Sequence, residues 1–224
     1  MTYVTAEQLP MPQSHMAAAS PFPHALHPLA QAVADGHTTD IANLSSHSPP
    51  NPSGLDNVTL LEWAIWNRQD ASLAALLAAG FDPSTPGMDG ESVAHLAASV
   101  DDPRYLQVLI EHNAPVDLIG GRAARTPIFR AVQSRRDAQF ALLLAAGADI
   151  NRRDAMGNTL LHVAAEVGDA ARALQLLQAG AAYDTANVRG VRFQSLLFEQ
   201  DSARLSNKGR ADRQAVLAWL AANQ

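Results

Sequence analysis

The sequence predicts an all-α protein built from stacked pairs of helices, and three observations support this class. Four similar blocks follow one another at spacings of 33, 34 and 33 residues, beginning at Thr59, Ser92, Thr126 and Thr159. Each block reaches a Gly or Asn 21 residues after its first residue. In the fourth block, Leu161, Ala164 and Ala165 form an apolar face at helical spacing. A single helix pair cannot bury both its faces, so the blocks are expected to stack.

The fourth block shows how each repeat is expected to fold. Thr159 stands where a residue caps the start of the first helix. Gly168 then permits a turn, and residues 169–179 form the second helix. Gly180 follows at the place of a left-handed C-terminal residue. The block is therefore a pair of antiparallel helices.

These residues resemble the ankyrin repeat, whose pattern runs from a turn glycine through T-P-L-H-x-A-A-x-x-G to L-L-x-x-G-A. The best local matches are GNTLLHVAAEVGD, and RTPIFRAVQSRRD with LLLAAGADIN. The resemblance covers residues 24–224 and implies an ankyrin-type α-solenoid of helix–turn–helix repeats joined by hairpin-like loops, called fingers here. It implies repeats starting near residues 27, 59, 92, 126 and 159, and a C-terminal capping repeat from 192.

Four of these repeats match well, and the two outer ones are degenerate. Terminal repeats are expected to diverge because one of their sides faces solvent. Residues 1–23 contain four prolines and little periodicity, so we expect a flexible N-terminal arm. A second proline-rich stretch, 45–57, interrupts the chain after the first helix pair.

Composition and motifs exclude several classes of function. The chain has no cysteine, which excludes disulfides, thiolate zinc sites and a cysteine nucleophile. It lacks a signal-peptide pattern and a long apolar run, so a cytoplasmic protein without membrane contact is expected. No H-E-x-x-H, G-x-S-x-G, G-x-G-x-x-G or P-loop motif occurs. We therefore expect no catalytic residues, cofactor, metal ion or small-molecule substrate.

Two groups of histidines were considered as sites. His162 shares its repeat position with His95, Glu62 and Phe129. The resemblance implies that such a histidine, with the threonine three residues before it, ties neighbouring turns together, so His162 is interpreted as scaffold. His24 and His27 lack a carboxylate at matched spacing, which makes a zinc site a weak hypothesis.

Charge is unevenly distributed along the chain. Residues 1–119 hold two basic residues and thirteen acids, a net charge of −11, whereas residues 120–224 hold fourteen basic residues and nine acids, a net of +5. Seven arginines gather around the third repeat, namely Arg122, Arg125, Arg130, Arg135, Arg136, Arg152 and Arg153. They form either a patch that docks an acidic protein surface or ordinary solvated charge with local ion pairs. Nucleic acid is disfavoured because no stacking aromatics accompany them.

The resemblance implies that partners contact the fingers and the inner faces of the first helices. The candidate partner-binding residues at these positions are Trp66, Asn67, Met88, Asp89, Glu91, Ser99, Val100, Arg122, Arg125, Gln133, Ser134, Met156 and Glu166. Trp66 is either an interface hot spot or a residue covered by the arm or by residues 45–57. Trp63 is expected between repeats, and Trp219 is expected to close the C-terminal cap.

The function that follows is a non-enzymatic module that binds one or a few proteins. It would act by occupying and inhibiting or regulating its partner, as bacterial immunity-type inhibitors in this family do. A host-directed effector or a scaffold subunit is the alternative that the resemblance leaves open. An enzyme is disfavoured because the required groups are missing.

Overall fold

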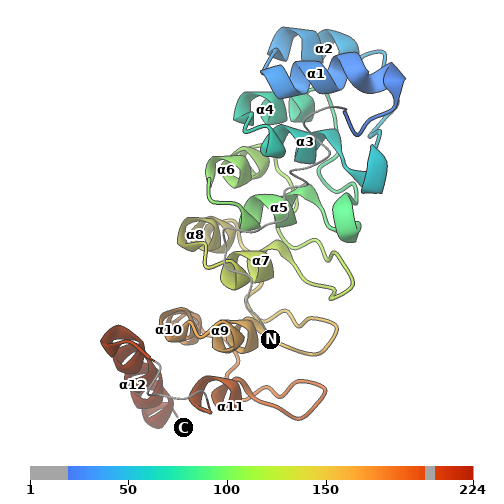
Figure 1. Cartoon of the computed structure of the whole chain (residues 1–224). Helices are drawn as coiled ribbons and strands as arrows, with labels where there is room; N and C mark the ends of the chain where they lie inside the picture. The colour runs from blue at the N-terminus through green and yellow to red at the C-terminus, as the bar shows by residue number, and fades with distance from the viewer. Residues whose placement is uncertain (1–19, 200–204, 224) are drawn as a thin grey trace. The chain divides into compact units, whose positions relative to one another are not determined.

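The computed structural model describes residues 20–199 and 205–223. In these ranges the regular structure is helical, and strand-like pairing is limited to three isolated bridges. The chain divides into two compact units, residues 1–115 (unit 1) and 116–224 (unit 2), which are described separately. The predicted all-α class of stacked helix–turn–helix repeats is confirmed within each unit (Figure 1).

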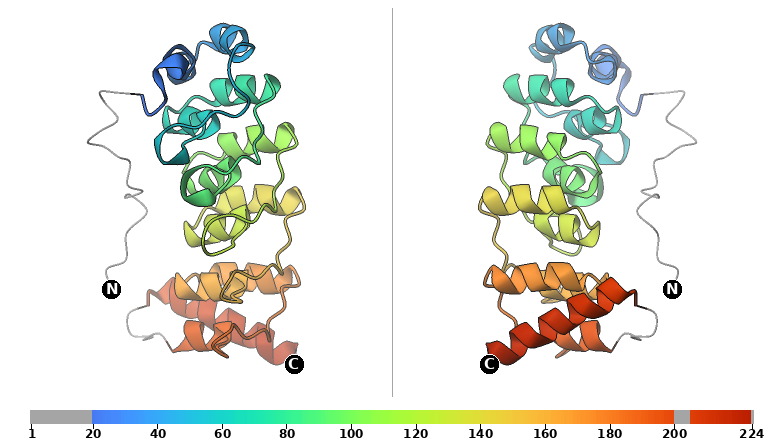
Figure 2. Two further views of the ribbon diagram at one scale, coloured as in Figure 1. Left: turned by 90° about the vertical axis from the view of Figure 1, so that its right-hand side faces the viewer. Right: turned by 90° about the vertical axis from the view of Figure 1, so that its left-hand side faces the viewer.

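Unit 1 is a stack of three helix pairs. Its helices are α1 (His27–Asp35), α2 (Thr38–Ser45), α3 (Leu60–Trp66), α4 (Asp70–Ala78), α5 (Val93–Ser99) and α6 (Arg104–Glu111). Short 3-10 helices precede three of the first helices: η1 (His24–Leu26), η2 (Leu55–Asn57) and η3 (Met88–Gly90). The first helices α1, α3 and α5 form one layer, and the second helices α2, α4 and α6 form another (Figures 1 and 2).

Unit 2 repeats this arrangement and ends in a longer helix. Its helices are α7 (Pro127–Gln133), α8 (Asp137–Ala145), α9 (Leu160–Glu166), α10 (Ala170–Gln178), α11 (Phe193–Phe198) and α12 (Asn207–Ala222). The 16-residue α12 packs against α10. The Tyr183 and Trp219 rings meet edge to face at 5.6 Å, and the Tyr183 hydroxyl donates to the Asn223 carbonyl. These contacts agree with a capping role for Trp219.

Sequence accounts for where the helices start and stop. The Thr59 and Ser92 side chains accept hydrogen bonds from backbone groups in the first turns of α3 and α5. The second helices end at residues in the left-handed region, such as Gly180 with a φ of 87° and Asn113 with a φ of 58°. The Gly or Asn that stands 21 residues after the start of each block is thus the left-handed residue at which the chain leaves the second helix.

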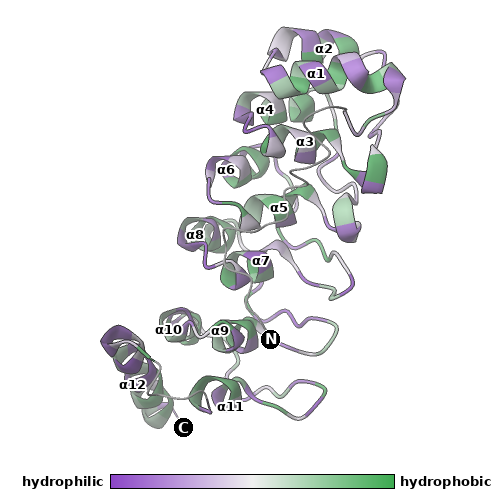
Figure 3. Cartoon of the chain, in the orientation of Figure 1, coloured by the Kyte–Doolittle hydropathy of each residue, from purple (hydrophilic) through white to green (hydrophobic). Residues whose placement is uncertain are grey.

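Both units bury a narrow apolar core between their two layers. Alanines of the first helices, among them Ala64, Ala97 and Ala164, are fully buried. Their small side chains let neighbouring first helices approach closely. Leucines of the second helices, such as Leu76 and Leu176, fill the space between layers and are also fully buried. Most helices therefore show both green and purple segments in Figure 3.

His162 is a scaffold residue, as the sequence analysis predicts. The Thr159 N–H donates to its Nδ1 at 3.1 Å, so Nδ1 accepts and the ring proton lies on Nε2. Nε2 donates to the Val191 carbonyl of the next finger at 3.0 Å. His162 is buried and thus links α9 to the finger that precedes α11. His95 makes the same contacts with Ser92 through Nδ1.

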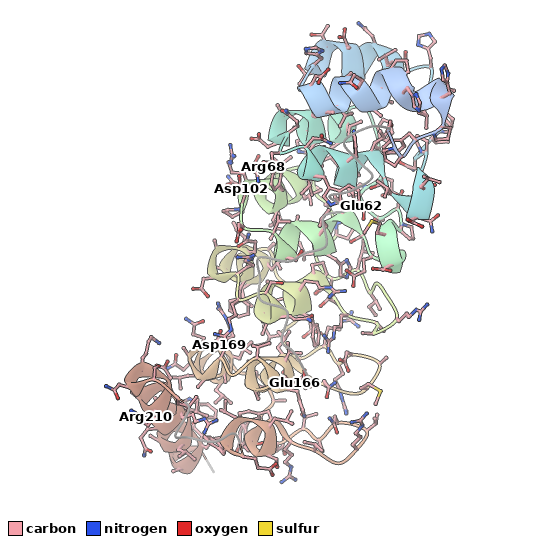
Figure 4. All side chains as sticks on the ribbon, in the orientation of Figure 1. Glu62, Arg68, Asp102, Glu166, Asp169 and Arg210 are labelled. Carbon is pink, nitrogen blue, oxygen red and sulfur yellow. The ribbon has the colours of Figure 1, made fainter. Side chains whose placement is uncertain are left out.

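Glu62 occupies the same repeat position in α3 and makes the link with the opposite polarity. Its carboxylate accepts hydrogen bonds from the Thr59 N–H at 2.8 Å and the Met88 N–H at 3.2 Å. Burial raises the pKa of Glu62, although the hydrogen bonds from Thr59 and Met88 oppose that effect. Figure 4 shows Glu62 on the side of α3 that faces η2 and η3. In α3 the Glu62 carboxylate accepts a hydrogen bond from the next finger, whereas in α9 the His162 ring donates one to it.

Residues 20–23 and the proline-rich stretch 45–57 are in contact. The Leu55 N–H donates to the Pro21 carbonyl at 2.9 Å. Phe22 is 4% exposed and meets Trp63 edge to face at 6.0 Å. The end of the predicted arm is therefore fixed on unit 1, while residues 1–19 lie outside the described residues.

Gly87→Ala is expected to destabilise unit 1. A Cβ at Gly87 would lie 2.2 Å from the Glu62 Oε2 atom, so the buried carboxylate must move and lose its hydrogen bonds. We expect the free energy of unfolding to fall by about 1–3 kcal/mol in urea denaturation. Gly209→Ala is the control, because its nearest contact would be an ordinary 3.5 Å and alanine favours α12. Equal stability of Gly87→Ala and wild type would contradict the steric argument.

Candidate protein-binding surface

The inner-helix candidates of unit 1 centre on Trp66 at the end of α3. Trp66 is half-buried, and its ring meets Trp63 edge to face at 6.4 Å. Trp63 is itself buried, and its Nε1 donates to the Ala30 carbonyl at 2.9 Å. Trp63 therefore lies between the first two repeats, as expected, and supports one side of the Trp66 ring.

The other inner candidates of unit 1 differ in what they expose. The Asn67 side-chain amide donates to the Trp63 carbonyl at 2.8 Å and so satisfies the end of α3. Ser99 is only 9% exposed, and its hydroxyl donates to the Leu96 carbonyl. Val100 is half-buried and has extended backbone, which ends α5. Of these three, Asn67 and Val100 offer a partner more side-chain area than Ser99.

The two fingers of unit 1 share one turn geometry and carry acidic tips. Asp56 and Asp89 both have a φ of 55°, in the left-handed region that aspartate tolerates better than most residues. Both Asp side chains are exposed, and Met88 and Glu91 beside Asp89 are half-buried. Leu55 is 73% exposed. The tips therefore combine negative charge with an apolar side chain.

The inner-helix candidates of unit 2 are polar. Gln133 is exposed at the end of α7, and its Oε1 accepts weak hydrogen bonds from Arg125 and Arg130 at 3.3 and 3.4 Å. Ser134, which follows it, is half-buried. Glu166 is exposed at the end of α9 (Figure 4).

Asp154 organises the fingers of unit 2. Its carboxylate accepts from Arg125 at 2.9 and 3.1 Å, from the Asn158 backbone and side chain, and from the Met156 N–H. The side chains of Arg125 and Asp154 are 16% and 2% exposed. Burial alone would raise the pKa of Asp154, but the hydrogen bonds from Asn158 and Arg125 outweigh it and hold the pKa below its usual value.

Backbone and side-chain hydrogen bonds join neighbouring fingers of unit 2. The Ala155 N–H donates to the Ala123 carbonyl at 2.8 Å, and the Val188 N–H donates to the Met156 carbonyl at 3.0 Å. The Arg153 guanidinium donates to the Ala186 carbonyl at 2.8 Å. The three fingers, residues 119–125, 152–158 and 186–192, therefore form a connected row.

These contacts show which arginines of the cluster are used inside the fold and which could form a patch that docks an acidic surface. Arg125 and Arg153 hold the fingers together, and Arg135 donates to the Val167 carbonyl. Arg152 lies 3.6 Å from Asp149 in an exposed pair of little stabilising value. Arg122 is exposed and makes no side-chain hydrogen bond or ion pair with the described residues. Arg122 is thus the member whose charge is most available to a partner.

The last finger, residues 186–192, exposes side chains that were not among the candidates predicted from the sequence. Val188 is 64% exposed, and Arg189 and Arg192 are exposed beside it. Val188 stands four residues before the Arg192 start of the last repeat, as Arg122 stands four before Thr126. The repeat register could have identified them, but the last repeat was treated only as a cap.

Neither a group of metal ligands nor a membrane-spanning helix occurs among the described residues. Within residues 20–199 and 205–223, no three metal-ligating side chains come together. In the same ranges, no helix has both the length and the apolar character needed to cross a bilayer. The described surface offers a partner charged groups, hydrogen-bonding groups and a few exposed apolar side chains.

A stack of helix pairs with interlinked fingers defines a protein-interaction module. The sequence model of ankyrin repeats in three copies matches residues 61–154 and 95–187, more than half of the chain. The chain belongs to the ankyrin repeat family, a fold that generally serves as a non-enzymatic interaction module.

Relatives agree with this assignment. Protein PhlB of Serratia liquefaciens is 41% identical over 149 residues, which cover 66% of each chain. The palmitoyltransferase Hip14 of Drosophila melanogaster is 30% identical over 114 residues, or 51% of this chain and 17% of Hip14. The chain thus matches just under two thirds of PhlB and a small part of Hip14.

Solved structures show the same fold at low identity. The ankyrin repeat protein EF0377 has a TM-score of 0.72 at 19% identity and covers 86% of this chain and 97% of its own. The structure of the Bd0816 predatory endopeptidase from Bdellovibrio bacteriovorus in complex with the immunity protein Bd3460 contains a chain with a TM-score of 0.68 at 22% identity. That match covers 86% of this chain and 97% of the other.

Asp154→Asn is expected to weaken unit 2 in a pH-dependent way. At neutral pH we expect a loss of about 2 kcal/mol in the free energy of unfolding, because Arg125 loses a charged acceptor. The folded-state pKa of Asp154 is lowered, so its stabilising contribution is present above the ordinary carboxyl pKa of about 3.9 and disappears as the pH falls through the folded-state value. Urea denaturation of both proteins at several pH values should show the difference shrinking in acid.

Asp149→Asn is the matched control, because its pair with Arg152 is exposed. We expect a change of under about 0.5 kcal/mol there. A stability gap for Asp154→Asn that stays constant from neutral to acid pH would contradict the assigned role of Asp154.

Proposed function

We propose that this chain is a non-catalytic module that binds a partner protein and inhibits or regulates it by occupying its surface. The binding residues are the inner-helix and finger positions predicted from the repeat register. The observation that carries the proposal is Trp66, a half-buried tryptophan at an inner-helix position. Tryptophan is enriched among the residues that dominate binding energy at interfaces.

The surroundings of Trp66 support a role in binding. Trp63 fixes one side of its ring, and Trp63 is in turn held by the Ala30 carbonyl. An aromatic side chain held in place before binding loses little conformational freedom when a partner covers it. Among the described residues of the arm, Phe22 packs on Trp63, the residue that supports the Trp66 ring.

One comparison favours inhibition over other uses of binding. A chain in the complex of an endopeptidase with an immunity protein has this fold. PhlB is from a bacterium, which supports a bacterial source for this chain. An immunity-type inhibitor would bind tightly at a fixed stoichiometry, whereas an adaptor or host-directed effector would leave its partner active. No specific feature of the described surface favours an adaptor or a host-directed effector.

Trp66→Ala is expected to weaken partner binding by about 2 kcal/mol or more. The partner would be isolated by co-purification with the full chain from the source cell, and affinity would then be measured by titration calorimetry. Leu217→Ala is the matched control, because Leu217 is 43% exposed on α12 and is not one of the inner-helix or finger positions. It should leave the affinity unchanged.

The same purified partner tests inhibition. An enzyme or toxin whose activity falls as one equivalent of the chain is added supports the inhibitor. A partner that binds with full activity points to an adaptor instead. If Trp66→Ala binds the partner as tightly as wild type while remaining folded, Trp66 has no part in the interface.

A further inference from the structure

The outer edge of the three unit 2 fingers is exposed, apolar at its tips and positively charged. We call this surface the finger edge and define it by Arg122, Met156, Val188, Arg189 and Arg192. Val188 is 64% exposed and Met156 is 42% exposed. The three arginines are exposed and make no side-chain hydrogen bond or ion pair with the described residues. Figure 1 shows the three fingers leaving the same side of α7, α9 and α11.

The charge of the finger edge is not neutralised locally. Residues 119–125, 152–158 and 186–192 contain a single acid, Asp154. Its side chain is 2% exposed and is paired with Arg125 inside the row. The buried pair cancels itself, so the exposed arginines give the finger edge its net positive charge.

The finger edge is also rigid. Backbone hydrogen bonds from Ala155 to Ala123 and from Val188 to Met156 fix each finger to the next. The Asn187 side chain donates to Asn158 at 2.8 Å, which continues the Asp154 network into the last finger. A ligand would meet fingers whose backbone is already held in place, so the ordering cost of binding is limited to the exposed side chains.

We propose that the finger edge binds an acidic segment of the partner protein, with apolar side chains of that segment placed on Met156 and Val188. Carboxylates of the segment pair with Arg122, Arg189 and Arg192, since a guanidinium matches a carboxylate with two parallel hydrogen bonds. This inference rests on the proposed protein-binding function and names the chemistry of the partner at this part of the surface.

The net charge of the whole chain favours a protein over a membrane or a nucleic acid. Residues 53–58 and 86–91 carry Asp56, Asp89 and Glu91 and no basic residue, and the whole chain has a net charge of −6. An anionic bilayer or a polynucleotide is negative along its whole surface and is repelled by a chain of net negative charge. A protein can present an acidic segment to unit 2 and other chemistry elsewhere.

The test uses the full chain and a short fluorescein-labelled peptide of alternating Glu and Leu as the probe, followed by fluorescence anisotropy. Wild type should bind the probe with an affinity that falls as NaCl rises. Arg189→Glu combined with Arg122→Glu should weaken binding at least about tenfold, or about 1.4 kcal/mol. A Glu–Ser peptide should bind more weakly than the Glu–Leu peptide, and a Lys–Leu peptide should not bind.

Two controls separate the finger edge from charge in general. Lys208→Glu changes the net charge as much as Arg189→Glu but lies on α12, and it should leave probe binding unchanged. Arg189→Lys keeps the charge but loses the two parallel N–H donors, so it should bind the probe more weakly than wild type and more tightly than Arg189→Glu. Thermal unfolding of Arg189→Glu should match wild type, because the described residues give this side chain no partner to lose.

Each remaining outcome overturns the inference. The proposal fails if the Glu–Leu peptide does not bind, if the double Glu variant binds it normally, or if phosphatidylglycerol vesicles bind the finger edge and the peptide does not. A second copy of the chain as the occupant would appear as dimers lost in the double Glu variant. If the isolated partner is lost by Trp66→Ala yet held normally by the double Glu variant, the proposed function stands and this inference alone is wrong.

Discussion

Each unit depends on one buried polar group that links a first helix to the finger of the next repeat. His162 does this by donating to the Val191 carbonyl, and Glu62 does it by accepting from the Met88 N–H. Apolar contact is not directional, so this link, together with the hydrogen bonds between fingers, fixes where a finger lies relative to its helix. The same two side chains accept hydrogen bonds from the buried N–H groups of Thr159 and Thr59 at the helix starts. One residue position thus sets both the start of a helix and its distance to the next repeat.

Much of the fold could be predicted from the sequence because the repeat enforces it. The spacing of the blocks, the reversal at Gly180 and the scaffold role of His162 follow from register, which many residues specify together. The arrangement of charged side chains could not be predicted in this way. Arg153 and Asp154 are neighbours in the sequence, yet Asp154 binds Arg125, 29 residues earlier, and Arg153 binds the Ala186 carbonyl. Which partner a long side chain reaches depends on finger geometry that the pattern does not encode.

The same limit applies to the candidate surface. Register identified the positions of Trp66 and Arg122, but it could not show that Trp63 supports Trp66 or that Arg122 is left without a partner among the described residues. Val188 and Arg189 were not predicted because the last repeat departs from the family pattern in its helix, while its finger keeps the register. Degeneracy in one half of a repeat therefore says little about the other half.

The reversed polarity at Glu62 has a consequence for how such a chain can change over time. A repeat that is linked to the next finger through a carboxylate, as at Glu62, requires an available N–H in that finger. It also requires a glycine where Gly87 stands, since any side chain there would collide with the carboxylate. A repeat that carries histidine requires a neighbouring carbonyl instead. The repeats are therefore not interchangeable parts. Duplication, deletion or shuffling of one repeat in this protein is viable only when the junctions on both sides keep donor matched to acceptor, which fixes the order of the repeats more firmly than their common shape does.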